Sequence, residues 1–224
     1  MSAELQAERL GDCLVLTISH PEARNALTAE MCAAGLEALS TAQRDADIRA
    51  VVLAGAQGQF CGGLHRFDAL DGLNDWILAL RDCEPLMVAA IDGQARGAGA
   101  ALALACDLLV AASDARMHLH DPLLPWLDVG GAQWLASRLL PRPACNEAML
   151  PGLGLDAARL HGLGVVNRLC AGGPALPTAL DLVDAVTASG HGRRKALPDA
   201  QTRTPELHDH LARQVGRIPQ QPEA

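Results

Sequence analysis

The chain has 224 residues, half of them apolar and one fifth charged, so it can form one domain with a full core and is too apolar for a disordered chain. Its net charge of −8 excludes a broad basic surface for nucleic acid, although a local basic patch could still bind a phosphorylated ligand. We therefore expect small molecules or further subunits as partners, and no nucleic acid.

Short β-rich runs alternate with helical periodicity through the first 120 residues. The runs predict strands at 13–19, 50–55, 87–91, 107–112 and 116–120. Apolar spacing predicts a helix from Thr28, which can cap its first turn, to about Arg44, and a second helix over 98–105. A buried strand that leads into a glycine-rich loop occurs twice, before residues 58–63 and before residues 97–99.

Helical periodicity resumes at Gly130 and dominates the rest of the chain. A helix is predicted over 156–161 with Gly162 at its end, followed by a short strand at 165–169 and helices near 175–188 and 205–216. The pattern indicates an α/β core over residues 1–170 and a C-terminal helical segment over residues 171–224.

Several expected absences narrow the class further. The seven cysteines are scattered singly, with no pair or Cys/His spacing suited to zinc, so we expect reduced thiols and no metal. The first residues lack the apolar stretch of a secretory signal, and no apolar run approaches the length of a membrane span. These features are typical of a cytoplasmic protein that does not enter a membrane.

Five segments, in order, resemble the enoyl-CoA hydratase/isomerase (crotonase) superfamily. They are HPEARNAL at 20–27, AVVLAGAQGQFCGG at 50–63, VAAIDGQARGAGAALALACDLLVAA at 88–112, GGAQWLASRLLPR at 130–142 and GLDAARLHGLGVVNRL at 154–169. The resemblance implies a crotonase-like spiral of ββα units and an acyl-CoA substrate, with coenzyme A entering as part of the substrate and no separate cofactor. It also implies an enzyme of fatty acid metabolism, a lyase or isomerase, that assembles as a trimer or hexamer.

The glycine loops of this family supply two backbone amides to the thioester oxygen. Chemistry at a thioester places negative charge on its carbonyl oxygen, and preorganised N–H groups stabilise that charge. By resemblance one donor is the amide of Ala98, at the start of a helix where N–H groups are unpaired. The other is the amide of Gly63 or Leu64, depending on a one-residue shift, and we expect both donors to begin helices and to leave an open, preformed oxygen site between them. The alternative is that these glycines only relax two turns.

The resemblance also indicates residues for the coenzyme A end of the ligand. Arg24, Ala26 and Leu27 occupy the family's loop for this part of the ligand, and Arg24 could pair with a phosphate. Arg66 is a second phosphate candidate, and each arginine could instead be an ordinary surface residue. Cys61 lies beside the amide pair, where a packed cysteine is a better interpretation than a nucleophile because no base accompanies it.

The chain departs from the family at its acids. Hydratases of this family use two glutamates, and Ala101 stands at the first of these positions. The acid nearest the second position is Asp121, while Asp128 resembles an aspartate of a branch that hydrolyses ring-CoA thioesters. Three functions therefore remain open: an enoyl-CoA hydratase/isomerase-type enzyme, a catalytically impaired acyl-CoA-binding relative, and an acyl- or ring-CoA hydrolase that uses Asp128.

Overall fold

The computed structural model describes residues 3–150, 153–188 and 204–216. Its larger sheet has six strands in the order β1-β2-β3-β4-β6-β9. These are β1 (Glu4–Leu10), β2 (Cys13–Ser19), β3 (Ala50–Gly55), β4 (Leu86–Ile91), β6 (Leu108–Ala112) and β9 (Arg168–Cys170). The first pair is antiparallel and all later pairs are parallel.

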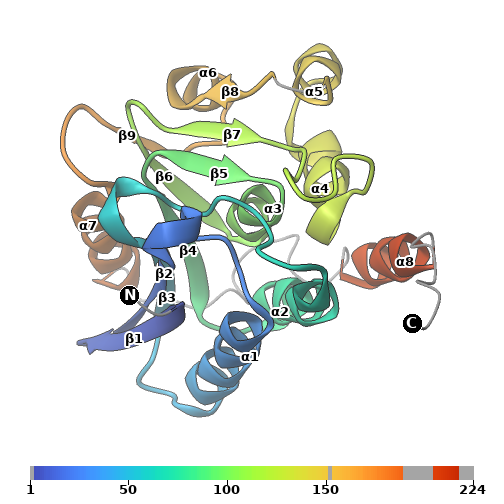
Figure 1. Ribbon diagram of the computed structural model, residues 1–224. Coiled ribbons are helices and arrows are strands. Elements are labelled where there is room, and N and C mark those ends of the chain that lie inside the picture. Colours follow the sequence, from blue (N-terminus) through green and yellow to red (C-terminus); the bar gives the residue numbers. More distant parts are fainter. Residues whose placement is uncertain (1–2, 151–152, 189–203, 217–224) are drawn as a thin grey trace.

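Both faces of the inner strands β2, β3, β4 and β6 are buried, which explains their uninterrupted apolar sequences. In β3, Val51 and Leu53 pack in one core cluster, while Val52 and Ala54 pack in the other. The second cluster lies under α7 (Ala175–Ala188), and the first lies between the sheet and α1 (Ala29–Arg44), α2 (Leu70–Asp82) and α3 (Ala98–Ala105). Figure 1 shows α7 on one side of the sheet and α1 to α3 on the other.

A smaller sheet of three strands positions the candidate site. Its order is β5-β7-β8, formed by β5 (Gln94–Arg96), β7 (Arg116–His118) and β8 (Leu155–Asp156). The chain steps from β4 to β5 and then into α3, which is the ββα unit expected of a spiral. Single bridges join Leu27 to Leu64 and Cys61 to Ala95, so successive turns of the spiral lie side by side in this layer.

The later helices lie beyond these turns. They are α4 (Ala132–Leu139), α5 (Arg142–Ala148), α6 (Ala157–Gly162) and α8 (Thr204–Val215). Helix α8 packs against α2 and against the short 3-10 helix Val129–Gly131 that precedes α4. In the described part of the chain, no helix has both the length and the apolar character that crossing a membrane requires.

Most predicted elements are confirmed, including the helix that Thr28 caps, but five were missed. Strands β1, β5 and β8 and helices α2 and α5 were not expected. Two strand bounds were also wrong: β7 ends at His118 rather than at residue 120, and the last strand begins at Arg168 rather than at residue 165. Strand β1 is an almost fully exposed edge strand that pairs with β2 in a hairpin. Its sequence therefore lacks the apolar alternation that predicts a half-buried strand.

Candidate functional site

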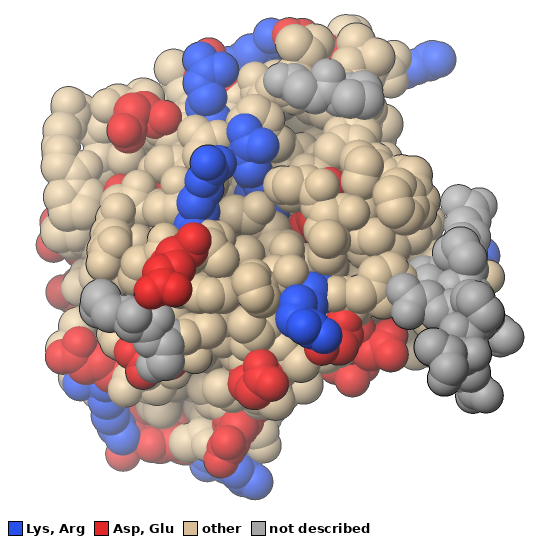
Figure 2. Space-filling view, viewed as in Figure 1, with Lys and Arg blue, Asp and Glu red and all other residues tan. Residues whose placement is uncertain are grey.

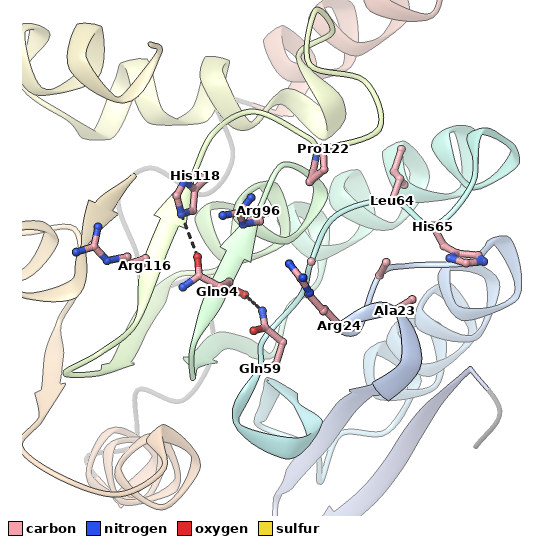
Figure 3. A pocket seen from close by; sticks show the side chains of 12 residues that line it. Ala23, Arg24, Gln59, Leu64, His65, Gln94, Arg96, Arg116, His118 and Pro122 are labelled. Carbon is pink, nitrogen blue, oxygen red and sulfur yellow. Dashed lines mark hydrogen bonds between the residues drawn. The ribbon is translucent and has the colours of Figure 1, made fainter. Parts of the chain in front are cut away.

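A cavity of about 640 Å³ opens where the successive turns of the spiral meet. Its ionisable lining side chains are three arginines and two histidines, and no Asp or Glu of the described residues lines it. These side chains are Arg24, His65, Arg96, Arg116 and His118. Figure 3 shows Arg24 and Arg96 reaching from different elements toward the space between Gln94 and Pro122. The cavity therefore suits an anionic ligand, although the protein as a whole is acidic.

The wall formed by β5 and β7 is held by a chain of polar contacts. His118 Nε2 lies 3.0 Å from Gln94 Oε1, and Gln59 Nε2 donates to the Gln94 carbonyl at 2.7 Å. Burial lowers the pKa of His118, and the positive charges of Arg96 and Arg116 lower it further. His118 therefore favours its uncharged form more strongly than a free imidazole does.

Space-filling atoms show the same feature from outside. Basic side chains gather in a hollow on the face seen in Figure 2, whereas most acidic side chains in that view lie toward its lower edge and sides. The local field in the hollow is thus opposite in sign to the net charge of −8.

Beside Leu64 and Pro122, which line the cavity, two backbone amides converge on one point. The N–H groups of Leu64 and Ala98 both donate to Asp121 Oδ2, at 3.0 Å and 3.2 Å. Two donors on one oxygen is the arrangement that a thioester oxyanion needs. Of the two sequence-based alternatives, the structure brings Leu64, not Gly63, into this pair.

The space between the amides is filled, however, and an open preformed site was expected. The Asp121 side chain is fully buried, with its carboxylate where a ligand oxygen would lie. The expectation that both donors begin helices was also wrong. Ala98 begins α3, whereas Leu64 precedes the 3-10 helix Phe67–Ala69 and is held by its bridge to Leu27.

Two glycines explain why the chain can bring these groups together. Gly63 has φ +114°, and a Cβ there would lie 2.7 Å from Asp121 Oδ2 and 2.9 Å from Pro122 Cδ. Gly97 has φ +46°, and a Cβ there would collide with Asp121. Any other residue at either position would be strained and would displace Asp121.

The remaining sequence candidates are placed differently. Arg24 and Ala26 line the cavity, as a ligand contact requires. Leu27 is fully buried; its amide donates to the Gly63 carbonyl and its carbonyl accepts from His65, so it aligns the Leu64 loop. Arg66 lies on the surface beside Asp68 and does not line the cavity.

The Cys61 thiol is a packed side chain rather than a nucleophile. It is fully buried, and burial raises its pKa to about 12, so the thiolate is negligible at neutral pH. Its Sγ lies 3.8 Å from the Gly63 carbonyl oxygen, and within the described residues this is the only hydrogen bond of the thiol.

Asp128 is not brought to the amide pair. Its carboxylate accepts from the amides of Gln133 and Trp134 at the start of α4, and His210 Nε2 of α8 lies 2.8 Å away. Ala101 is buried inside α3, and a Cβ added at Gly130 would lie 2.9 Å from the Ala101 Cβ. The sequence did not mark Arg96, Arg116 or His118 as cavity residues.

Comparison with known proteins identifies the family of the chain. A sequence model of the enoyl-CoA hydratase/isomerase family matches residues 9–215. The chain is 30% identical to the enoyl-CoA hydratase EchA19 of Mycobacterium tuberculosis, over 82% of this chain and 74% of that protein.

Solved structures show the same likeness. An enoyl-CoA hydratase from Polaromonas sp. JS666 is 33% identical with a TM-score of 0.79, covering 94% of this chain and 89% of that one. A carnitinyl-CoA hydratase from Mycobacterium avium is 26% identical with a TM-score of 0.76, covering 96% and 90%. The chain belongs to the enoyl-CoA hydratase/isomerase family of the crotonase superfamily.

Proposed function

We propose that the protein binds an acyl-CoA thioester and catalyses proton transfer at the acyl α-carbon, rather than efficient hydration. One observation carries this proposal: the Leu64 and Ala98 amides converge on a single oxygen beside a cavity lined by arginines. Phosphates of coenzyme A would lie near Arg24 and Arg96, and the thioester oxygen would bind to the two amides.

Asp121 is the group placed to move the proton. With the thioester oxygen on the amides, its carboxylate would take the α-proton, and the C–H electrons would form an enolate whose charge lies on that oxygen. Return of the proton to the α-carbon gives exchange, and its delivery to the γ-carbon moves a double bond. One carboxylate can serve both steps, whereas hydration in this family uses a second acid at the position of Ala101.

Exchange in heavy water tests this proposal. Butyryl-CoA incubated with the protein in D2O should lose its α-proton signal by NMR, and Asp121→Asn should slow that loss by about 10²–10⁴-fold. Binding of free coenzyme A, measured by calorimetry, should be unaffected by the substitution because Asp121 lies beyond the phosphate end of the cavity.

The same assay separates the two alternatives. Coenzyme A binding without any exchange, and without turnover of crotonyl-CoA or an aryl-CoA panel, would select the non-catalytic binding relative, which the lack of a carboxylate at Ala101 favours. Thioester hydrolysis that Asp128→Asn abolishes would select the hydrolase. The Asp128 carboxylate already contacts α4 and α8, so we expect Asp128→Asn to leave the α-proton exchange unchanged.

A further inference from the structure

The carboxylate of Asp121 is a complete occupant of the amide site. Its Oδ2 accepts from Leu64 and Ala98, and its Oδ1 accepts from the amide of Leu123 at 2.9 Å. The side chain is fully buried, so these donors replace the water that a carboxylate would otherwise require. The contact therefore belongs to the folded interior and is not an exposed rotamer.

The backbone around this carboxylate fits the side chain closely. Gly63 and Gly97 both adopt positive φ, and a Cβ on either would contact Asp121. Pro122 follows directly and restricts the backbone of Asp121 to extended conformations. The two loops that present the amides are thus built around an oxygen from the protein's own chain.

A thioester oxygen and Asp121 Oδ2 cannot share that point. Both are electron-rich acceptors that need the same two N–H groups, and only one oxygen can lie within hydrogen-bond distance of both. We propose that Asp121 closes the site in the free protein and that an acyl thioester binds productively only by displacing its carboxylate. This inference rests on the proposed function, because it concerns the oxygen that the amides would bind.

Closure by Asp121 has a measurable consequence for affinity. When a ligand binds only to a minor open state, its apparent affinity equals the affinity for that state multiplied by the fraction of molecules in it. The penalty falls only on ligands whose carbonyl oxygen must reach the amides. Free coenzyme A and a thioether analogue, which carries no carbonyl, can occupy the arginine-lined part of the cavity while Asp121 stays in place.

The test compares butyryl-CoA with its thioether analogue S-butyl-CoA by calorimetry. The unaltered protein should bind the two within about threefold of each other, because closure cancels the advantage of the carbonyl. In Asp121→Ala the two amides are free, and the thioester should bind at least about tenfold more tightly than the thioether. The affinity for free coenzyme A should be the same in both proteins.

Asp92→Ala is the matched control. Asp92 is also buried and its carboxylate accepts a backbone N–H, that of Ala175, but it contacts neither amide of the pair. Its removal should leave the ratio of thioester to thioether affinity unchanged. An equal ratio in the unaltered protein and in Asp121→Ala would overturn the inference, as would a gain of the same size in Asp92→Ala.

A structure of the unaltered protein with butyryl-CoA gives an answer that does not depend on a variant. The thioester oxygen should lie within hydrogen-bond distance of the Leu64 and Ala98 amides, with the Asp121 carboxylate rotated away. A bound thioester whose oxygen lies elsewhere, with Asp121 still on both amides, would refute the displacement. Failure of free coenzyme A to bind either protein would instead refute the proposed function, and the inference with it.

Discussion

At the residue scale, the amide pair could be predicted while most of the cavity lining could not. The glycine loops at Gly63 and Gly97 occur in family-like segments, so the sequence indicated the amide of Ala98 and left the other donor open between Gly63 and Leu64, of which the structure selects Leu64. Arg96 lies within the 88–112 segment, but nothing in that segment marks its side chain as a cavity residue, and Arg116 lies outside all five segments. Both arginines reach one cavity only because β5 and β7 pair in register, with Gln94 opposite Arg116 and Arg96 opposite His118.

The role of Asp121 depends on contacts with residues that are far from it in the sequence. It lies 57 residues from Leu64 and 23 from Ala98, and both contacts are made across turns of the spiral. The sequence marked Asp121 as the acid nearest to a catalytic position. Only the structure shows that its Oδ2 accepts hydrogen bonds from the two amides. A spacing rule could not predict this, because helices and strands of variable length intervene.

A glutamate restored at position 101 should not restore hydration. The Ala101 side chain faces the region where Gly130, Leu73 and Ile77 meet, and all of these are buried. A carboxylate there would be buried without a partner, so we expect Ala101→Glu to lower the free energy of unfolding by about 3 kcal/mol or more. Urea denaturation measures this loss. Ala33→Glu, on the exposed face of α1, should change stability by less than about 0.5 kcal/mol; a stable, hydrating Ala101→Glu protein would contradict the expectation.

At the scale of the elements, burial decides which helices a sequence reveals. Helix α1 was predicted because its apolar spacing and its cap agree, and Thr28 indeed accepts from the Met31 amide. Helix α2 was missed although Leu70, Leu73, Ile77 and Leu80 lie on one buried face. Its first two turns carry two aspartates, a glycine and an asparagine, which are poor helix formers and obscured that spacing.

The Asp128 carboxylate, in the segment before α4, contacts both α4 and α8. Its loss should therefore lower the stability of the protein. The carboxylate accepts from two amides at the start of α4 and contacts His210 of α8, so it connects the core to the C-terminal helix. We expect Asp128→Ala to lower the free energy of unfolding by about 1–3 kcal/mol. Asp128→Asn should lose less, because the amide oxygen can still accept one of these hydrogen bonds.

Chemical denaturation of both variants measures this difference. Asp209→Ala is the control, since Asp209 lies exposed on the same helix α8 and, among the described residues, its ion pair is with its neighbour His208, at 3.8 Å. It should leave the midpoint unchanged within error. An Asp128→Ala protein as stable as the unaltered chain would show that α8 needs no such connection.

At the scale of the whole molecule, the sequence predicted the class of fold and the alternation of its units. It could do so because both faces of the inner strands of the larger sheet are buried, which leaves long apolar strands such as AVVLAG at 50–55. Of the smaller sheet only β7 was predicted, because strands of two or three residues such as β5 and β8 are defined by their partners rather than by composition. The site lies where these short strands meet.

Exposed apolar residues bear on how copies of the chain assemble. Five of the eight large exposed hydrophobic side chains in the described residues lie between residues 123 and 153: Leu123, Trp126, Leu139, Leu150 and Leu153. Trp126 is 72% exposed, although a tryptophan contributes more apolar area than any other side chain. Such concentration in one segment indicates a surface that another subunit covers.

We therefore expect a homo-oligomer, with a trimer or a dimer of trimers favoured by the family, that contacts through this segment. Light scattering at micromolar concentration should give a mass near 70 kDa or its double, since one chain has a mass of 23.4 kDa. Trp126→Glu places a charge in the covered surface and should shift the mass toward that of one chain, because an unpaired buried charge costs several kcal/mol. Leu10→Glu is the control, because Leu10 is exposed on the edge strand β1, far along the chain from the segment. A monomeric mass for the unaltered protein, or equal dissociation by both substitutions, would mean that residues 123–153 do not form the contact.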